Sequence, residues 1–357
     1  MKRIIFLLPA HVYHPCGGVK VVFEYANYLA KRGWRVSIVS GSTASFRRVS
    51  WYERIKSALR YPFILVTRRY RPTWFALDER IRTISVPSLN QHFVPDADVY
   101  VATAVETAEQ LMEYETDAKK AYLIQDYEDW NVGEERLFAT YRSNLIKFVI
   151  SHWLQDRVAP HSTSPVTLIP NGFDFAKFGC DVPVEKRNPN SVAFMYHVRP
   201  SKDVPTGLKA LEVVHRQHPD LKVNMFGVYP KGPEVPDWIS YTQNPTQHQL
   251  RAIYNSSAIY LAASRDEGWG LTVGEAMICG CAICCTACIG FMEMVKPGVD
   301  GLVSPVGDAQ MLADNLVTLL HDQPKRAHLA KMAMQTIRRF DWEDSKRELL
   351  RFLKGIK

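Results

Sequence analysis

Residues 264–277 of this 357-residue chain read Ser264-Arg265-Asp266-Glu267-Gly268-Trp269-Gly270-Leu271-Thr272-Val273-Gly274-Glu275-Ala276-Met277. Two glutamates stand eight positions apart, separated by a glycine-rich turn that opens a helix. Backbone N–H groups at this turn can point at a phosphate, and the helix N-terminus adds partial positive charge. A carboxylate before the turn can accept hydrogen bonds from sugar hydroxyls, and one inside the helix can reach a ribose. The stretch therefore suits an anionic, nucleotide-activated sugar.

A purely structural interpretation of the same residues stays open at this point. Thr272 and Glu275 have the spacing of a capping box, in which Glu275 would only satisfy the start of its own helix. Glu267 would then be an ordinary solvated charge in a loop. Short motifs also occur by chance, so the order of the other segments along the chain has to decide.

Short apolar strands alternate with amphipathic helices along the chain, and this pattern predicts parallel sheets in an α/β protein. One series begins with a strand at residues 4–8, followed by a helix that Gly33 ends. A second series begins with a strand at 192–196. The polar stretch 181–190 separates them and reads as a linker. We predict two Rossmann-like domains, over residues 1–180 and 191–340.

Composition bounds the class of protein. The apolar fraction is 46% and the net charge is +7, which fits a globular protein that handles phosphates or rests on anionic lipid. No apolar run is long enough to span a bilayer. Pro9 ends the first apolar run too early for a signal peptide, so we expect a buried strand and a cytoplasmic protein. No nucleic-acid-binding motif is present, and we expect no nucleic-acid partner.

Two sequence features invite a metal interpretation. Five of the seven cysteines lie within residues 279–288 and form two C-x2-C pairs. However, 282–286 reads as a buried strand whose successive side chains face opposite ways, and no histidine is nearby. Asp96 and Asp98 form a D-x-D triplet that reads as a turn before a strand. We therefore expect reduced, buried thiols and no metal site.

The Glu267/Glu275 spacing resembles the E-x7-E signature of family 4 glycosyltransferases, which are retaining enzymes with the two-domain GT-B fold. The resemblance covers nearly the whole chain and is most specific over residues 264–303. Further segments resemble the family's in the same order: the Gly17-Gly18 loop after the first strand, S-x-W-L at 151–154, P-N-G-x-D at 170–174, G-x-x-E at 290–293, and Gly301-Leu302-Val303, which resembles the G-x-L-V segment.

The resemblance implies an arrangement of domains and a set of site residues. Two parallel sheets would face one another across a cleft, and the C-terminal helix, 341–357, would return to the first domain. The donor would bind mainly to the second domain and the acceptor mainly to the first. The implied catalytic residues are Lys202, Arg199, Glu267 and Asp126. The implied donor-binding residues are Gly17, Gly18, Gly227, Asn244, Gly268, Trp269, Gly270, Leu271 and Glu275.

The implied cations have a physical rationale. Breaking a sugar–phosphate bond leaves negative charge on a nucleoside diphosphate, and fixed cations stabilise that charge when no metal is bound. Lys202 offers a point charge and Arg199 a planar fork. The family's arginine usually stands about five residues before the lysine, where this chain has His197. Whether Arg199 or His197 takes that place is open, and exposed loop cations are the alternative.

The first domain departs from the family at one segment. Many members carry a histidine there, whereas this chain reads Gln125-Asp126-Tyr127-Glu128. This resembles the Q-D-Y-E variant of some polysaccharide-building members. Gln125 or Asp126 would then hold the sugar or the acceptor hydroxyl. The alternative is that the carboxylates only solvate a loop.

Residues 47–71 carry eight cations and a single acid, Glu53, interleaved with aromatic side chains. Cations beside aromatic rings suit the headgroup zone of an anionic membrane. A solvated basic loop is the alternative. The stretch therefore predicts a peripheral contact with the inner face of the cell membrane.

We expect a retaining, metal-independent glycosyltransferase of the hexosyltransferase type. It would move a sugar from a nucleotide-activated donor to a hydroxyl of a glycan or lipid-linked acceptor in cell-surface polysaccharide biosynthesis. No cofactor is expected, because the nucleotide sugar is itself a substrate. Two alternatives remain: a nucleotide-sugar epimerase on the same fold, and a noncatalytic glycan- or nucleotide-binding subunit.

Overall fold

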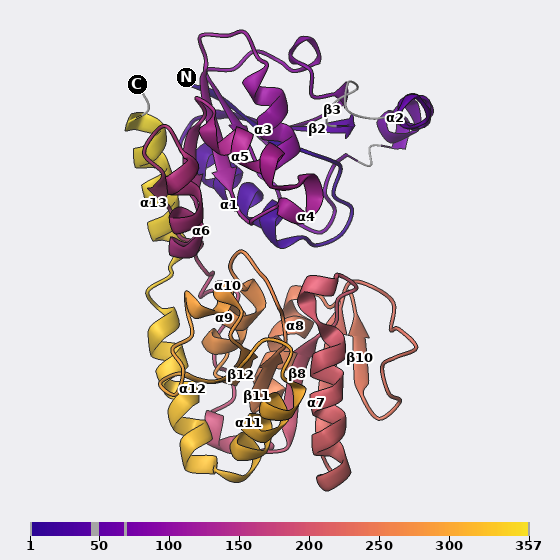
Figure 1. The fold of residues 1–357 in the computed structure, drawn as a ribbon, viewed down its shortest axis with the longest axis vertical. Coiled ribbons are helices and arrows are strands. Elements are labelled where there is room, and N and C mark those ends of the chain that lie inside the picture. Colours follow the sequence, from indigo (N-terminus) through magenta and orange to yellow (C-terminus); the bar gives the residue numbers. More distant parts are fainter. Residues whose placement is uncertain (1, 44–49, 68–69, 356–357) are drawn as a thin grey trace. The chain divides into compact units, whose positions relative to one another are not determined.

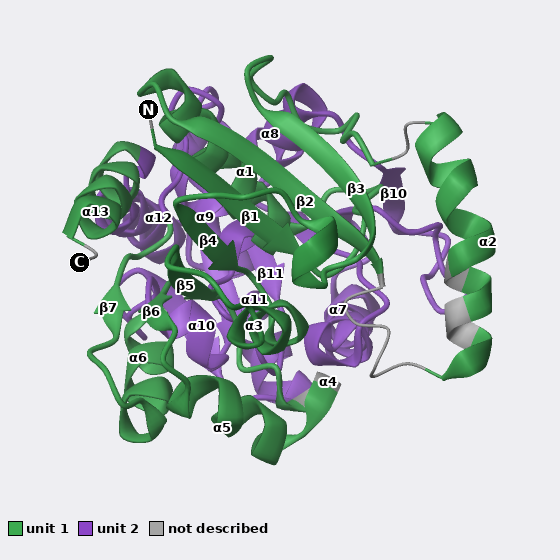
Figure 2. Ribbon diagram, turned by 90° about the horizontal axis from the view of Figure 1, so that it is seen from above, with its two compact units in different colours: residues 1–171, 343–357 green, residues 172–342 purple. Residues whose placement is uncertain are grey.

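The computed structural model describes residues 2–43, 50–67 and 70–355. The chain divides into two compact units. Unit 1 comprises residues 1–171 and 343–357, and unit 2 comprises 172–342 (Figure 2). Each unit contains one parallel sheet with its own helices, as the alternating sequence pattern predicts.

Unit 1 is built on a seven-stranded parallel sheet in the order β3-β2-β1-β4-β5-β6-β7 (Figure 1). The strands are β1 Arg3–Leu8, β2 Arg35–Thr43, β3 Arg82–Ser88, β4 Val99–Ala102, β5 Lys119–Ile124, β6 Ile146–Val149 and β7 Thr167–Leu168. The helices are α1 Gly17–Lys31, α2 Trp51–Thr67, α3 Val105–Met112, α4 Asp129–Val132, α5 Glu134–Arg142, α6 His152–Val158 and α13 Trp342–Gly355.

The strand β1 lies inside this sheet, between β2 and β4. Residues 4–8 are all buried, as a continuous apolar run predicts for a strand covered on both faces. Gly33 has a φ of +83° just after α1, so the predicted glycine stop is confirmed. The C-terminal helix α13 belongs to this unit from Glu343 onward, where Lys346 pairs with the buried Glu24 of α1 at 3.3 Å.

Unit 2 is built on a six-stranded parallel sheet in the order β10-β9-β8-β11-β12-β13. The strands are β8 Ser191–Met195, β9 Lys222–Gly227, β10 Ser240–Gln243, β11 Ile259–Ala262, β12 Ala282–Thr286 and β13 Gly301–Ser304. The helices are α7 Val204–Gln217, α8 Gln247–Ser256, α9 Leu271–Ile278, α10 Ile289–Met292, α11 Ala309–His321 and α12 Gln323–Ile337. Its core packs Phe194, Met225 and Leu261 of the sheet against Leu211 and Leu316 of the helices.

The boundary between the units lies after Asn171, earlier than the linker at 181–190 that the sequence suggests. Arg187 explains the difference. Its buried guanidinium donates to the carbonyls of Val182 (2.9 Å) and Ser257 (3.0 Å), and also to that of Cys279. A polar stretch that satisfies its hydrogen bonds on one domain is part of that domain.

The basic stretch forms an element that the sequence analysis did not expect. Residues 51–67 form the helix α2, with Pro62 inside it, so the alternative of a solvated loop is wrong for this part of the stretch. Arg47, Arg48, Arg68 and Arg69 lie outside the described residues. Within the described part of the chain, no helix combines the length and apolar character needed to cross a membrane.

Candidate functional site

The sheet order of unit 2 places the candidate site. The strand order reverses direction between β8 and β11, and ligands of open α/β sheets bind beyond the carboxyl ends of the strands at such a point. Lys202 follows β8, and Glu267 follows β11. The topology therefore brings together two segments that lie 65 positions apart in the sequence.

Lys202 and Glu267 form an ion pair with 2.8 Å between Nζ and Oε2. The side chains are only 19% and 10% exposed, so the pair is largely shielded from water. The second oxygen of Glu267 accepts a hydrogen bond from the Ser264 hydroxyl at 2.7 Å. The carboxylate is thus held from both sides and fixed in orientation before any ligand arrives.

The glycine-rich turn beside this pair is shaped by close packing. Gly270 has a φ of +95° and forms the N-cap of α9, whose first residue is Leu271. A Cβ atom at Gly290 would collide with the carbonyl of Glu267, so α10 packs directly on the backbone of the turn. The turn thus has little freedom to move, and its N–H groups stand at a helix N-terminus, as expected for an anion site. Gly268 lies within the same turn.

Glu275 is the fifth residue of α9 and is buried. The hydroxyl of Tyr254 approaches its Oε2 at 3.4 Å. The capping-box interpretation is wrong, because the helix begins at Leu271 and Thr272 therefore lies inside it rather than at its N-cap. A buried carboxylate within a helix needs polar partners, which leaves room for a role beyond the local helix start.

His197 and Arg199 take different positions after β8. The Nδ1 atom of His197 accepts a hydrogen bond from the backbone N–H of Arg199 at 3.0 Å, and its ring contacts Tyr229. Burial, reinforced by the charges of Lys202 and Arg199, lowers the pKa of His197 to about 4. A neutral imidazole cannot supply a cation at pH 7, so Arg199, whose side chain is exposed, is the candidate for a second cation beside Lys202.

Of the other predicted donor-binding residues of unit 2, Gly227 and Asn244 lie together where β9 and β10 end, and Trp269 lies in the turn before α9. Gly227 ends β9, and a Cβ there would approach the carbonyl oxygen of Tyr196 at 2.5 Å. Asn244 has a φ of +48° and donates its N–H to the carbonyl of Gly227 at 2.8 Å. Trp269 is buried and its ring contacts Phe340 edge-on, so only its backbone is available to a ligand.

Unit 1 assembles its own predicted residues at the corresponding point of its sheet, where the order reverses between β1 and β4. Gly17 and Gly18 begin α1, and a Cβ at Gly18 would lie 3.3 Å from the amide nitrogen of Gln125. The Gln125 Oε1 atom is buried without a hydrogen-bond partner among the described residues. Asp126 accepts the N–H of Tyr127 at 3.0 Å.

Not every carboxylate of the Q-D-Y-E segment is available to a ligand. Glu128 accepts the backbone N–H of Val105 at 2.7 Å and so caps the start of α3. This gives Glu128 a structural role and leaves Gln125 and Asp126 as the candidates for substrate contact.

The cysteine cluster and the D-x-D triplet both have structural roles. Cys279, Cys281, Cys284, Cys285 and Cys288 are all buried. Cys281, for example, donates to the carbonyl of Tyr254 at 3.1 Å, and burial raises its thiol pKa to about 12. Asp98 accepts the backbone N–H of Arg3 at 2.7 Å and its guanidinium at 3.1 Å. Within residues 2–43, 50–67 and 70–355, no group of three or more His, Cys, Asp or Glu side chains could hold a metal.

Sequence reasoning missed the residues that support the site. The Thr286 hydroxyl donates to the carbonyl of Ser264 at 2.6 Å, linking the end of β12 to the residue that holds Glu267. Arg265 pairs with the buried Asp203 at 2.8 Å, next to Lys202. The only sequence signal for this second pair is the position of both residues beside predicted site residues.

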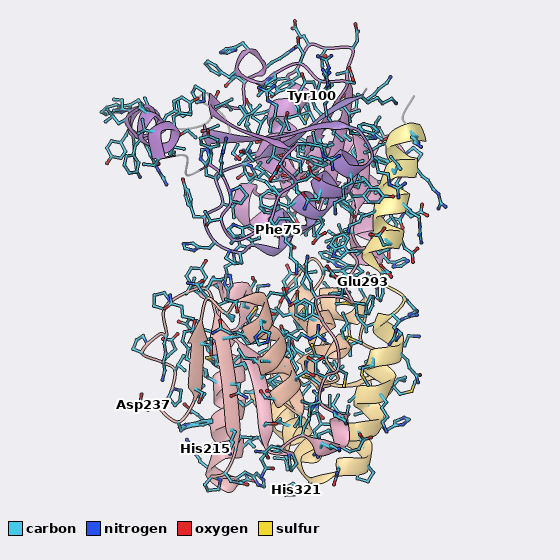
Figure 3. All side chains as sticks on the ribbon, turned by 180° about the vertical axis from the view of Figure 1, so that it is seen from behind. Phe75, Tyr100, His215, Asp237, Glu293 and His321 are labelled. Atoms are coloured by element: carbon cyan, nitrogen blue, oxygen red, sulfur yellow. The ribbon has the colours of Figure 1, made fainter. Side chains whose placement is uncertain are left out.

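The G-x-x-E segment, which ends at Glu293, lies in unit 2. Glu293 lies at the end of the unit opposite to His321, which is in the last turn of α11 (Figure 3). Because α11 runs back from the carboxyl end of the sheet, Glu293 is at the same end as Lys202 and Glu267. The G-x-x-E segment thus lies at the end of unit 2 that carries the site.

Comparison with known proteins supports a family. Residues 181–336 match the family described as Glycosyl transferases group 1. The chain is 26% identical over 177 residues to the D-inositol 3-phosphate glycosyltransferase of Salinispora tropica, covering 44% of this chain and 37% of that protein. It is 25% identical over 199 residues to the phosphatidyl-myo-inositol mannosyltransferase of Mycolicibacterium smegmatis, covering 53% and 51%.

A likeness of fold extends over nearly the whole chain. The crystal structure of Anabaena HepE in complex with UDP and glucose superposes with a TM-score of 0.75 at 14% identity, covering 99% of this chain and 100% of that one. This confirms the predicted GT-B class, with two parallel-sheet α/β units. The family match itself supports the glycosyltransferase group 1 family and lies within unit 2.

Proposed function

We propose that this protein is a retaining glycosyltransferase of the hexosyltransferase type. It moves a sugar from a nucleoside diphosphate donor to a hydroxyl of a glycan or lipid-linked acceptor. Unit 2 binds the donor and unit 1 the acceptor. The proposed setting is cell-surface polysaccharide biosynthesis at the cytoplasmic face of the membrane.

The observation that carries this proposal is the Lys202–Glu267 pair beside the glycine turn of α9. A donor needs a cation for its diphosphate, a carboxylate for its sugar hydroxyls and N–H groups at a helix start. A cation, a carboxylate and a helix start lie together where the strand order of unit 2 reverses, between β8 and β11. Glu275, buried in the same helix, is the proposed partner of the ribose.

The proposed chemistry divides the roles of the pair. The bond between the sugar and the diphosphate breaks, a bond to the acceptor oxygen forms, and the acceptor hydroxyl gives up its proton to an oxygen of the departing diphosphate. Before that proton arrives, negative charge grows on the diphosphate. Lys202 stabilises this charge, and Arg199 adds a second cation. Glu267 then keeps its hydrogen bond from Ser264 and turns its other oxygen to the sugar.

In unit 1, Gln125 and Asp126 are the proposed contacts for the acceptor hydroxyl or the transferred sugar. The buried and unpartnered Oε1 of Gln125 supports this, because such an oxygen is costly unless a ligand donates to it. Gly17 and Gly18 let a substrate approach the start of α1 closely, which suits a phosphate group. This assigns the glycines a direct role in binding.

The reaction is proposed to need neither a metal nor a cofactor. The fixed cations Lys202 and Arg199 offer the charge that a divalent metal would otherwise supply. The two sequence features that invite a metal interpretation have other structural explanations. Asp98 accepts a hydrogen bond from the backbone N–H of Arg3, and the five clustered thiols are buried.

The test is turnover with a panel of nucleotide sugars, with and without lipid-linked acceptor, and with and without EDTA. UDP-sugars come first, because the structural neighbour HepE was solved with UDP and glucose. We expect one donor to be consumed, with transfer to the acceptor, retention of anomeric configuration and no effect of EDTA.

Other outcomes would contradict specific parts of the proposal. Interconversion of the donor sugar without acceptor would identify an epimerase. Tight nucleotide binding without turnover of any donor would identify a noncatalytic subunit. Loss of turnover in EDTA, restored by Mg²⁺ or Mn²⁺, would refute metal independence.

A further inference from the structure

The helix α2 exposes an apolar stripe to solvent. The stripe consists of Trp51, Ile55, Leu59 and Val66, which are 73%, 50%, 75% and 84% exposed. Their spacing places them on one face of a helix. Seven of the sixteen exposed large apolar side chains among the described residues belong to this one helix. Such a concentration of apolar surface marks a binding surface.

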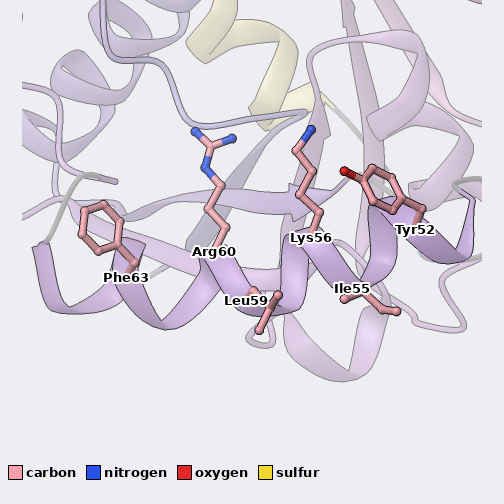
Figure 4. Close-up of a pocket in the computed structure, with 6 residues that line it drawn as sticks. All are labelled: Tyr52, Ile55, Lys56, Leu59, Arg60 and Phe63. Atoms are coloured by element: carbon pink, nitrogen blue, oxygen red, sulfur yellow. The ribbon is translucent and has the colours of Figure 1, made fainter.

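Polar and aromatic residues flank this α2 stripe on one side. Tyr52 and Phe63 lie next to it, and Lys56 and Arg60 follow around the helix. Figure 4 shows Lys56 and Arg60 pointing to a different side of α2 from Ile55 and Leu59. A surface that passes from apolar through aromatic to cationic matches the boundary between acyl chains and anionic headgroups.

The opposite face of α2 fixes the helix to unit 1. Ile64 is 2% exposed, and the Tyr61 hydroxyl donates to the carbonyl of Ser85 in β3 at 2.9 Å. Figures 1 and 2 show α2 at the edge of unit 1, beside β2 and β3. The stripe is therefore presented by an attached helix rather than by a free segment.

Charge identifies the occupant of this surface. Residues 47–71 contain eight cations and one acid, a net charge of +7. The net charge of the whole chain is also +7, so the remaining residues, with 36 cations and 36 acids, are neutral overall. A neutral protein surface or a second copy of this basic segment would not complement such a cluster, whereas an anionic bilayer does.

We propose that α2 is an interfacial helix that docks unit 1 on an anionic lipid bilayer. The α2 stripe enters the boundary between headgroups and acyl chains. Lys56 and Arg60 contact lipid phosphates. The inference stands on α2 itself and goes beyond the proposed sugar transfer, although a lipid-linked acceptor would lie at the same surface.

The experiment is sedimentation of the full chain with vesicles of phosphatidylcholine alone or mixed with phosphatidylglycerol. We expect binding only to the anionic vesicles, and weaker binding at higher salt. The double variant Leu59→Ser/Val66→Ser should reduce the partition coefficient by about tenfold or more. The double variant Lys56→Gln/Arg60→Gln should reduce it by about tenfold.

Two control variants carry matched substitutions in unit 2 instead of α2. Val299→Ser/Met311→Ser removes two apolar side chains that are 45% and 44% exposed, and Lys222→Gln/Lys325→Gln removes two exposed cations. Both controls should bind like the unchanged protein. Nucleoside diphosphate binding, measured without vesicles, should be the same in all four variants, which separates this proposal from the proposed function.

Three results would overturn the proposal. One is equal binding to neutral and anionic vesicles, and another is no binding to either. The third comes from sedimentation velocity without lipid: a dimer that Leu59→Ser/Val66→Ser dissociates would show that the α2 stripe contacts a second copy of this chain.

Discussion

Lys202 has one ammonium group for two partners. Its Nζ is 2.8 Å from Glu267 in the absence of substrate, and the proposed reaction needs the same charge at a departing diphosphate. The two demands are compatible, because an ammonium group has three N–H donors and can bridge two anions. The ion pair also holds the lysine side chain in a defined orientation beside Glu267. Lys202 thus connects the sugar side of the site with the phosphate side.

Replacing Lys202 by alanine should lower turnover by about a hundredfold or more, since removal of one preorganised electrostatic group commonly has that effect. Arg199→Ala should have a smaller effect, because Arg199 is exposed and screened by solvent. Steady-state kinetics with the identified donor measures both. Lys222→Ala, which changes an exposed lysine at the other end of the sheet, is the control. Near-normal turnover of Lys202→Ala would remove the lysine from the mechanism.

At the scale of elements, the site depends on how α10 packs against the turn before α9. Gly290 leaves no space for a side chain, because a Cβ would collide with the carbonyl of Glu267. The packing of α10 against the turn therefore fixes the position of Glu267 relative to Lys202. The G-x-x-E segment, at 290–293, thus has a packing role that its sequence position alone does not reveal.

The variant Gly290→Ala should shift the turn that carries Glu267. We expect a loss of about 1–3 kcal/mol in the free energy of unfolding, as is usual for overpacking. Turnover should fall by about tenfold or more, because small displacements of positioning groups are costly. Gly355→Ala is the control, since a Cβ at Gly355 meets no atom within 4 Å. Wild-type turnover in a destabilised Gly290→Ala protein would show that the turn position does not limit the chemistry.

The same scale shows what the sequence could and could not predict. Strands such as 4–8 and 259–262 were predictable, because they are short apolar runs between turn residues. The helix α2 was not predicted, because its apolar residues lie among cations and around Pro62. The Glu267 and Glu275 spacing predicts a site at the turn before α9, and this stays a prediction. Ser264 and Thr286 could not be predicted, since their hydrogen bond joins residues 22 apart, one in the turn after β11 and the other at the end of β12.

At the scale of the whole molecule, each unit contains a half-buried histidine beside cations. His11 in unit 1 accepts or donates a hydrogen bond with the Ser85 hydroxyl at 2.9 Å, and burial with the nearby charge of Arg60 lowers its pKa to about 4. His197 in unit 2 has its pKa lowered to about 4 by burial and by Lys202 and Arg199. The two units have separate cores, so each histidine affects the stability of its own unit.

The stability of both units should fall as the pH decreases from about 6.5 to about 4. In the unfolded chain both imidazoles have a pKa near 6.5, so in this window the unfolded state binds more protons and is favoured by acid. Above pH 6.5 both forms are neutral and the full stability is present. Allowing for solvent screening, the loss is on the order of 1–2 kcal/mol per ring. Urea unfolding at pH 7 and pH 4.5 measures this loss of stability.

His11→Gln and His197→Gln should each reduce the acid-dependent loss, whereas His248→Gln, which changes an exposed ring, should not. An unchanged acid-dependent loss in both variants would show that other groups carry it.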